Sequence, residues 1–564
     1  MSDSPTQIAM LHAAGTLLSI DVGERTAETV SIEDELSRYI GGRGIGTYLA
    51  HERIPFDADH FGPENRLYFT VGPLQQSQMS FTGRMSITGL SPLSDGLLSS
   101  NAGGYLSRNF VGTGHSVVEI TGQSDELLAI HVTPDGVEFE EVPELEGATV
   151  PDVTDEMNAR HDLESENLAT IGPAGENKVR FASVMTYNDR AFGRGGLGAV
   201  LGSKRVKTIS FRGDAAPDVD LPATDVHSEI HGNAATSDDI MRRQGTTSLT
   251  TMINEQFSLP TRYFSEMTFE GAEGIDGDAV EEKKYKKASC SVCAFACKLP
   301  TRDEQTGLET EGPEFETVFS FGSNCGVDDI VDLMKSNKLC DNLGMDTISA
   351  GVTIAAYLDS EDEFGNADLI HELLEKIAYR EEEGDLLAEG VGRIHGDLGT
   401  ENWAIKGIEH AAHDGRVCQG QGLSYAVANR GGDHLYAGVM IAEYHGMIDP
   451  EGTAGKAGIV IEQENRTAVQ DSAILCAFSG QFIDEETMST LLNTEYDTIQ
   501  DVGASIVELE RHFNNMRGMN IEDDALPYDL PDLADSIQEY YELRGWNDDG
   551  TIPDEAVAAP ASGD

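Results

Sequence analysis

Short apolar runs separated by turn residues fill the first part of the chain, up to about residue 215. Runs such as Leu67–Val71, Val117–Thr121 and Leu128–Val132 are rich in β-branched, aromatic and aliphatic residues, with Gly, Pro, Asn and Asp between them. This pattern predicts strands and turns. The stretch Asp214–Leu221 (DAAPDVDL) then indicates a domain boundary.

After that boundary, the apolar residues recur with a spacing near 3.6, which is typical of helices that bury one face. The spacing is clear in Ile330–Cys340, Ile348–Leu358 and Leu369–Glu382. From about Asn402 onward, Gly-rich loops alternate with helices such as Ala504–Arg517. The second part of the chain is therefore predicted to be mainly helical.

The 564 residues suggest several domains, at about 150 residues per domain. We predict an α+β protein with a β-rich N-terminal domain over residues 1–215 and two mainly α-helical domains over residues 216–400 and 401–564. The last residues, Pro553–Asp564 (PDEAVAAPASGD), have the composition of a disordered tail.

The charge is strongly acidic along the whole chain: 99 Asp and Glu face 38 Lys and Arg, for a net charge of −61. Such self-repulsion is tolerable where salt screens it, since the Debye length falls to about 3 Å at 1 M. An acidic surface argues against nucleic acid and anionic membranes as partners. The start of the chain has no basic region or apolar core typical of a secretory signal, and no apolar run is long enough for a membrane span. We therefore expect a cytoplasmic, salt-adapted protein.

Three of the seven cysteines are clustered as Cys290-x2-Cys293-x3-Cys297. Three thiolates at this spacing favour an iron–sulfur cluster, which needs a fourth thiolate. A zinc site and an accidental spacing are the alternatives. The spacing also fits a reducing compartment better than a disulfide framework. The candidates for the fourth ligand are Cys325, Cys340, Cys418 and Cys476.

Two Gly-rich segments carry arginine among the glycines, Gly41–Gly46 (GGRGIG) and Gly193–Lys204 (GRGGLGAVLGSK). Neither has the spacing of a dinucleotide-binding or Walker loop. They suit contacts to phosphate or a pterin, or equally the packing of tight turns. Four lysines in Glu281–Lys287 (EEKKYKK) could form a docking spot for an acidic electron carrier, but a solvated helix start is the favoured interpretation.

Carboxylates and one histidine are candidates for proton transfer and ligand binding. Glu309–Glu316 (ETEGPEFE) places four glutamates around a Gly-Pro turn, and Asn429–Leu435 (NRGGDHL) contains His434. Asp341–Asp346 (DNLGMD) and Asp471–Cys476 (DSAILC) share a shape, with Asp first and Asp or Cys sixth. Their aspartates could bind a ligand's N–H groups or merely cap helices.

Taken together and in order, these segments closely resemble the tungsten-containing aldehyde ferredoxin oxidoreductase family. The resemblance runs from Gly41 to about Phe478. The motifs that carry it are GGRGIG (Gly41–Gly46), GPENRLYFTVGPL (Gly62–Leu74), TGR (Thr82–Arg84), SNAGGYL (Ser100–Leu106), IGPAGEN (Ile171–Asn177), NDRAFGRGGLGAVLGSK (Asn188–Lys204), the cysteine cluster, EGPEFE (Glu311–Glu316), DNLGMD, HDGR (His413–Arg416), NRGGDHL and DSAILC.

The resemblance implies a β-rich first domain that forms a base for two pterins holding a tungsten, with two helical domains closing over it. It implies aldehyde oxidation to carboxylate, with electrons passing through a [4Fe-4S] cluster to ferredoxin. The site residues that it implies are Cys290, Cys293, Cys297 and Cys476 for the cluster; Arg84 between pterin and cluster; Asn101 and Ala191, through their carbonyls, for a Mg²⁺ on the pterin phosphates; Gly103, Arg190, Asp341, Asp346, Asp471 and Leu475 for the cofactor; and Glu316 and His434 beside the metal.

The chain departs from the family at three points. Ile474 stands where a Gly is usual, and Phe315 stands where a Tyr is often found. The Glu-x2-His motif, linked in some members to an iron between subunits, is missing, so we do not expect that iron and the oligomeric state stays open. The rival functions are carboxylate or ring reduction on the same cofactor, and a non-catalytic iron–sulfur electron-transfer protein. The aldehyde, and tungsten as against molybdenum, stay undetermined.

Overall fold

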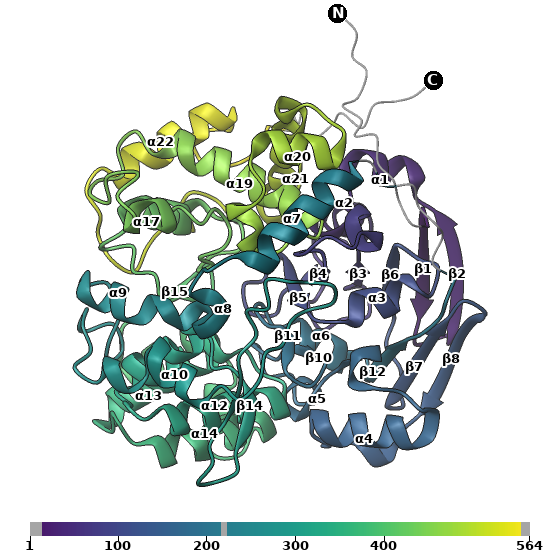
Figure 1. Ribbon diagram of the computed structural model, residues 1–564, viewed down its shortest axis with the longest axis horizontal. Helices are drawn as coiled ribbons and strands as arrows, with labels where there is room; N and C mark the ends of the chain where they lie inside the picture. Colours follow the sequence, from purple (N-terminus) through teal and green to yellow (C-terminus); the bar gives the residue numbers. More distant parts are fainter. Residues whose placement is uncertain (1–13, 216–220, 222, 554–564) are drawn as a thin grey trace, which may run out of the picture.

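The computed structural model describes residues 14–215, 221 and 223–553 (Figure 1). The predicted boundary at Asp214–Leu221 and the predicted tail fall largely on the other residues, so both stay predictions. The N-terminal region lies on one side of the molecule, and the helices that follow it form the other side in two groups (Figure 1). This arrangement confirms the predicted fold class, a strand-rich first region followed by helical ones.

Two six-stranded sheets of mixed direction form the N-terminal region. They run in the orders β2-β1-β6-β3-β4-β5 and β11-β10-β9-β12-β7-β8. The three strands predicted from apolar runs are confirmed to within one residue at each end. The strands are β1 (Thr16–Asp21), β2 (Thr26–Ser31), β3 (Leu67–Thr70), β4 (Arg84–Leu90), β5 (Leu97–Gly103), β6 (Val117–Thr121), β7 (Leu128–Thr133), β8 (Gly136–Glu141), β9 (Leu168–Thr170), β10 (Val184–Thr186), β11 (Arg190–Phe192) and β12 (Val206–Phe211).

The N-terminal region also contains helices, which the prediction of strands and turns alone missed. They are α1 (Glu33–Tyr39), α2 (Gly42–Arg53), α3 (Leu106–Val111), α4 (Val150–His161), α5 (Pro173–Glu176) and α6 (Leu197–Ser203). The GGRGIG segment begins α2, and its Arg43 is fully buried, with Nε and Nη2 each 2.7 Å from the carboxylate of Glu510. The guanidinium therefore holds distant parts of the chain together, while its Nη1 lies 3.5 Å from Asp471.

The predicted helices of the middle region are confirmed, with differences of up to three residues at their ends. The third begins at Ala367 and ends at Tyr379, not at Glu382, because Arg380 adopts a left-handed conformation (φ 52°) that closes it. The elements are α7 (Thr224–Thr236), α8 (Met241–Gln244), α9 (Leu249–Glu255), α10 (Gly277–Lys283), β13 (Pro300–Arg302), β14 (Glu309–Glu311), α11 (Phe315–Thr317), α12 (Ile330–Leu343), α13 (Thr347–Glu361), α14 (Ala367–Tyr379), α15 (Glu383–Leu387) and α16 (Val391–Leu398).

The last region is built on α19 and α21, which pack along each other. The helix predicted at Ala504–Arg517 is confirmed as the second half of α21, which begins at Tyr496. α7 lies across this group, beside α20 (Figure 1). The elements are β15 (Ala404–Ile405), β16 (Ile408–Glu409), α17 (Gln419–Val427), α18 (Met440–Tyr444), α19 (Ala457–Ser472), α20 (Glu485–Leu492), α21 (Tyr496–Met516) and α22 (Leu533–Arg544).

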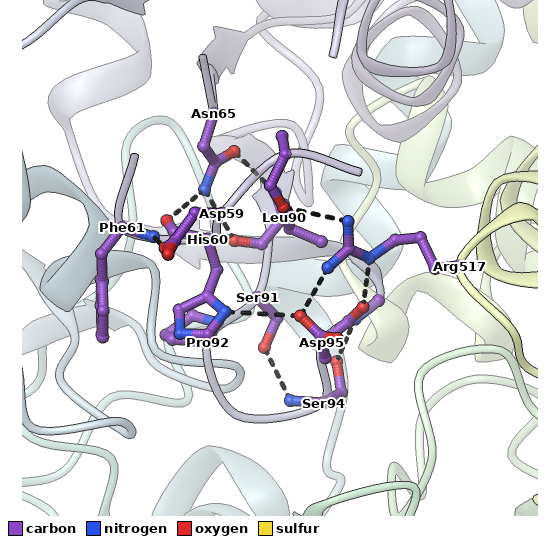
Figure 2. A network of polar contacts seen from close by, with 12 residues as sticks. Asp59, His60, Phe61, Asn65, Leu90, Ser91, Pro92, Ser94, Asp95 and Arg517 are labelled. Carbon is purple, nitrogen blue, oxygen red and sulfur yellow. Dashed lines mark hydrogen bonds and ion pairs between the residues drawn. The ribbon is translucent and has the colours of Figure 1, made fainter. Parts of the chain in front are cut away.

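Polar contacts join the end of α21 to the loops of the first sheet (Figure 2). Arg517 donates to the carboxylate of Asp95 at 2.6 Å and to the carbonyl of Phe56 at 2.6 Å. Asp95 in turn lies 3.4 Å from Nδ1 of His60. Asn65 ties the same loops together by donating to the carbonyls of His60 and Leu90 (Figure 2). These contacts hold the end of α21 against the loops of the first sheet, whose strands β4 and β5 contribute to the site described below.

Within the described ranges, no helix is both long and apolar enough to cross a membrane.

Candidate active site

Four cysteines gather at one end of the hairpin formed by β4 and β5. Arg84 begins β4 and pairs with Gly103, the last residue of β5. The Sγ of Cys476 lies 4.0 Å from Nη1 of Arg84. A Cβ on Gly103 would lie 2.9 Å from the Sγ of Cys290, so glycine is what lets this thiol approach the strand.

The two other clustered cysteines join this group through their packing. Cys293 and Cys297 pack on the same apolar core as Cys476. Burial raises the pKa of the Cys297 thiol well above its usual value, and the neighbouring Cys476 raises it further. Of the four candidates for the fourth thiolate, Cys476 is the one beside the other three. Cys325, Cys340 and Cys418 are buried in the other large core.

The two aspartate motifs have the same backbone shape. Asp341 lies in the last turn of α12, and the helix ends at Gly344 with φ 77°. Asp471 lies in the last turn of α19, and Ile474, at the matching position, has φ 62°. A left-handed residue closes both helices, which explains why glycine is usual at this position.

Ile474 adopts the left-handed conformation that a glycine would take at this position. The backbone therefore has the same shape as at Gly344, although isoleucine replaces the usual glycine. A β-branched residue at positive φ costs about 1–2 kcal/mol. The side chain of Ile474 is 1% exposed and packs against Gly42 at the start of α2. Burying such a side chain contributes about 1.5–3 kcal/mol, which offsets the strain.

A cavity of about 210 Å³ lies next to the cysteines, between β5, β11 and the ends of α12 and α13. All but two of the cofactor-binding residues expected from the resemblance line it. Asp471 stays outside but accepts a hydrogen bond from Asn101 at 2.7 Å, while Leu475 is buried in the neighbouring core. The lining residues are Arg84, Asn101, Gly103, Asp189, Arg190, Ala191, Gly193, Glu311, Glu314, Thr317, Asn337, Asp341, Met345, Asp346 and Thr347.

The cavity wall carries buried polar atoms that the protein itself leaves without hydrogen bonds. They include Nε of Arg190, Oδ1 of Asn101 and Oδ1 of Asp189. Each such atom costs about 1–3 kcal/mol when it stays unpaired. Burial also raises the pKa of Asp189 to about 6, and it raises that of Asp341 well above its usual value. A polar ligand with both hydrogen-bond donors and acceptors would pair with these atoms of the cavity wall.

The glutamates of Glu311–Glu316 lie in two different parts of the site. Glu311 forms an ion pair with Arg190, and Glu314 accepts from Thr246 at 2.6 Å, both at the cavity. Glu316 belongs to α11, directly before the π-helical turn Val318–Gly322. Its Oε2 accepts a hydrogen bond from the backbone N–H of Ala412 at 3.0 Å.

Glu316 meets two histidines. Its Oε1 lies 3.5 Å from Nε2 of His434 and 3.7 Å from Nε2 of His413, and it has no hydrogen bond of its own. These three donor atoms lie within 4.8 Å of one another. Burial lowers the pKa of His413 well below its usual value, so this imidazole is neutral at neutral pH. Nδ1 of His413 also lies 3.3 Å from the hydroxyl of Tyr444.

Sequence reasoning did not predict the contacts of several residues of this site. His413 lies in the HDGR segment, which is one of the motifs that carry the family resemblance. No role was predicted for this histidine. Arg194 stands in the second Gly-rich segment; its Nε lies 3.3 Å from Asp346, and its Nη1 is buried without a hydrogen bond. Phe315 packs its ring on His413 with the centroids 5.4 Å apart. No spacing rule links these residues, because they come from different elements.

Comparisons with known proteins agree with this picture. Residues 17–213 match the family described as "Aldehyde ferredoxin oxidoreductase, N-terminal domain", and residues 223–559 match "Aldehyde ferredoxin oxidoreductase, domains 2 & 3". The chain is 32% identical to the tungsten-containing aldehyde ferredoxin oxidoreductase of Thermococcus kodakarensis, over 96% of this chain and 97% of that protein. It is 31% identical to the enzyme of the same name from Pyrococcus furiosus, over 96% and 98%.

More distant proteins share the fold. The WOR-like subunit of an aliphatic sulfonate oxidoreductase from Pyrococcus furiosus is 26% identical, over 96% of both chains. The solved active-site complex BamBC of benzoyl coenzyme A reductase superposes with a TM-score of 0.81 over 97% of both chains, at 20% identity. The matches over nearly the whole chain confirm the resemblance: this chain belongs to the aldehyde ferredoxin oxidoreductase family, a family of tungsten-pterin oxidoreductases.

Proposed function

We propose that this protein oxidises aldehydes to carboxylates at a tungsten bis-pterin centre and passes the electrons through a [4Fe-4S] cluster to ferredoxin. The observation that carries the proposal is the meeting of Glu316, His413 and His434 at one point. Glu316 is adjacent in the chain to Thr317, which lines the polar cavity beside the cysteines. Proton-carrying groups, a cavity for a polar cofactor and thiolates thus occur in one place.

The residues of the cavity fit a pterin. The unpaired Nε of Arg190 and Oδ1 of Asn101 provide a donor and an acceptor for a polar heterocycle. The carboxyl oxygens of Asp341, whose pKa burial raises, provide further hydrogen-bond acceptors. Arg190 and Arg194 would face the cofactor's phosphates. The carbonyls of Asn101 and Ala191 are oxygen ligands of the kind that Mg²⁺ prefers, which supports the Mg²⁺ site expected from the resemblance.

The arrangement of the thiols supports a cluster over a zinc ion. Cys476 and Cys290 lie beside Arg84 and Gly103, which pair at one end of the β4–β5 hairpin. The spacing Cys290-x2-Cys293-x3-Cys297 lacks the two C-x2-C units or the histidine pair that are common in structural zinc sites.

The chemistry that such cofactors supply when bound is the acceptance of two electrons from the substrate and their release one at a time. The protein's own part is to handle protons. Oxidation of an aldehyde with water to a carboxylate releases three protons along with two electrons, and Oε1 of Glu316 can take one of the protons. Nε2 of His434 can donate a hydrogen bond to an oxygen on which negative charge develops. Arg84, between Cys476 and the cavity, would link the two cofactors.

Steady-state assays test the proposed reaction. Protein purified from its native host without oxygen should contain tungsten and should reduce a low-potential dye, and ferredoxin, with an aldehyde as the electron donor. Carboxylate reduction and ring reduction are assayed in the same samples. Protein that holds tungsten but oxidises no aldehyde would contradict the proposed reaction, and protein that holds iron but no tungsten would favour a non-catalytic electron carrier.

Two exposed lysines mark a docking position for ferredoxin. The lysine run lies at the end of α10, not at a helix start as the favoured interpretation had it. Lys283 is paired with Asp303, and Lys284 donates to the carbonyls of Arg242 and Arg243. Lys286 and Lys287 are exposed, shortly before the first clustered cysteine.

Replacing both Lys286 and Lys287 with glutamate should raise the KM for ferredoxin by about 3–10-fold, because charges at the rim of an interface steer association. Turnover with a small dye should stay unchanged. Lys335→Glu, a change at an exposed lysine on α12, is the matched control. An unchanged KM for ferredoxin in the double variant would rule out this docking position.

We also propose that the protein works in a salt-rich cytoplasm. Its net charge of −61 supports this, because molar salt screens the repulsion between so many carboxylates. The melting temperature should rise from dilute to molar salt, because screening removes the repulsion between carboxylates. A melting temperature that falls or stays flat over that range would contradict salt adaptation.

A further inference from the structure

A second group of metal-binding side chains lies in the N-terminal region, away from the cavity. It consists of His131 on β7, Glu140 on β8 and His161, the last residue of α4. None of these elements contributes to the lining of the cavity. Figure 1 shows α4, the edge strand β8 and its neighbour β7 at the outer side of the second sheet. We propose that these three residues bind a zinc ion, a site that is independent of the proposed redox function.

The strand pairing places the donors on one face. His131 lies opposite Glu138 in the β7–β8 ladder, so Glu140, two residues on, is its diagonal neighbour on the same side of the sheet. α4 packs over this side through Val153 and Met157, which share a small core with Ala129 of β7. Its last residue therefore reaches the same carboxylate.

The distances approach those of a zinc site. Oε2 of Glu140 lies 3.1 Å from Nε2 of His131 and 2.7 Å from Nε2 of His161. Ligands at about 2.0–2.1 Å around a tetrahedral zinc are about 3.3 Å apart, so a shift of a few tenths of an ångström admits the ion. All three donor atoms already lie within 4.8 Å of one another.

Neighbouring groups orient the ligands. Nδ1 of His131 lies 2.8 Å from the hydroxyl of Ser210, which can hold the tautomer that leaves the lone pair on Nε2. Nη1 of Arg160 donates at 2.8 Å to Oε1 of Glu140, so the other carboxylate oxygen faces the histidines. The imidazole of His161 is 36% exposed, so water can supply a fourth ligand.

The surrounding charge favours a cation. Arg160 is paired with Glu140, Glu144 and Glu156 together, and Arg212 donates to the carbonyls of His161 and Asp162, while Glu138 also acts on His131. The site also sits at the C-terminal end of α4, where the helix dipole is negative. Two imidazoles and a carboxylate suit zinc better than calcium or magnesium, which prefer oxygen ligands alone. The ion would tie α4 to the sheet.

Metal binding by the full-length, cofactor-loaded protein tests this proposal. The protein is dialysed against micromolar Zn²⁺, and its zinc, iron and tungsten are measured together. Wild type should take up about one zinc per chain, and zinc-edge X-ray absorption should indicate nitrogen and oxygen ligands without sulfur. His161→Gln should weaken zinc binding by more than about 100-fold, beyond the loss of 10–100-fold that is typical of groups that only orient a ligand.

Matched controls separate ligation from charge. Glu156→Gln removes a carboxylate that touches Arg160 but neither histidine, and His445→Gln removes an exposed histidine elsewhere. Both should bind zinc as wild type does, and His161→Gln should keep its iron and tungsten because its side chain lies at the surface. The proposal is overturned if wild type takes up no zinc, if His161→Gln binds it equally well, or if the spectrum indicates sulfur ligands.

Discussion

Replacing Glu316 with glutamine should lower aldehyde turnover by about 10²–10⁴-fold, the usual contribution of a general acid–base group. Glutamine keeps the shape of the side chain and can still accept the hydrogen bond from Ala412, but it cannot take a proton. The content of tungsten and iron should therefore stay at the wild-type level. Turnover is measured at saturating aldehyde with a low-potential dye, so that ferredoxin docking does not enter.

Two further variants serve as comparisons for the loss of turnover in Glu316→Gln. Glu309→Gln is the matched control, because Glu309 is an exposed residue of the same segment whose carboxylate pairs with Arg302. It should leave turnover unchanged. His434→Ala should lower turnover less than Glu316→Gln does if the imidazole only stabilises charge. Equal, near wild-type turnover in Glu309→Gln and Glu316→Gln would refute the assignment, and the proton acceptor would then have to be sought elsewhere in the site.

Replacing Cys293 with serine should abolish the cluster signal in electron paramagnetic resonance and most of the transfer of electrons to ferredoxin. Wild type should hold about four iron atoms per chain, as one four-iron cluster requires. The loss is expected to be large because a hydroxyl group replaces one of only four thiolate ligands. Iron analysis and the spectrum of the reduced protein check it.

Cys325→Ser is the control for this change. The Sγ of Cys325 lies 3.2 Å from the carbonyl of Ser320 in the core, and a serine hydroxyl can donate a hydrogen bond to the same oxygen. Its iron content and signal should match wild type. If Cys293→Ser retains the signal, the cysteines do not hold the cluster in the way proposed, whatever the reaction of the enzyme.

Local patterns predicted many of the elements well. The strand at Val117–Thr121 and the helix that begins at Ile330 were predicted at their observed starts, because each has a clear apolar period and a polar boundary. α2 was missed because three glycines lie within it, and glycine disfavours helices in isolation. The packing of α2 against β4 and α21 outweighs that local cost.

The cofactor-binding residues were predicted from ordered motifs, and most of them line one cavity. The pairing of Arg190 with Glu311 and the contacts of His413 were not found, since the partners are far apart in sequence and lie in separate elements. Arg43 shows how the fold adds contacts that a motif does not reveal. An arginine among glycines resembles a phosphate-binding loop, but only the fold places Glu510 against it.

The amino-acid sequence by itself determined the family, the order of strand-rich and helical regions, the spacing of the cysteines and the acidic surface. These features depend on local periodicity and on residue types at short separations, which the chain carries without its fold. Only the tertiary structure decided that Ile474 adopts a glycine-like turn, that Arg190 pairs with Glu311, and that His413 joins Glu316 and His434. Each of these results depends on contacts across long sequence separations, and burial and backbone geometry decide them only once the chain has packed.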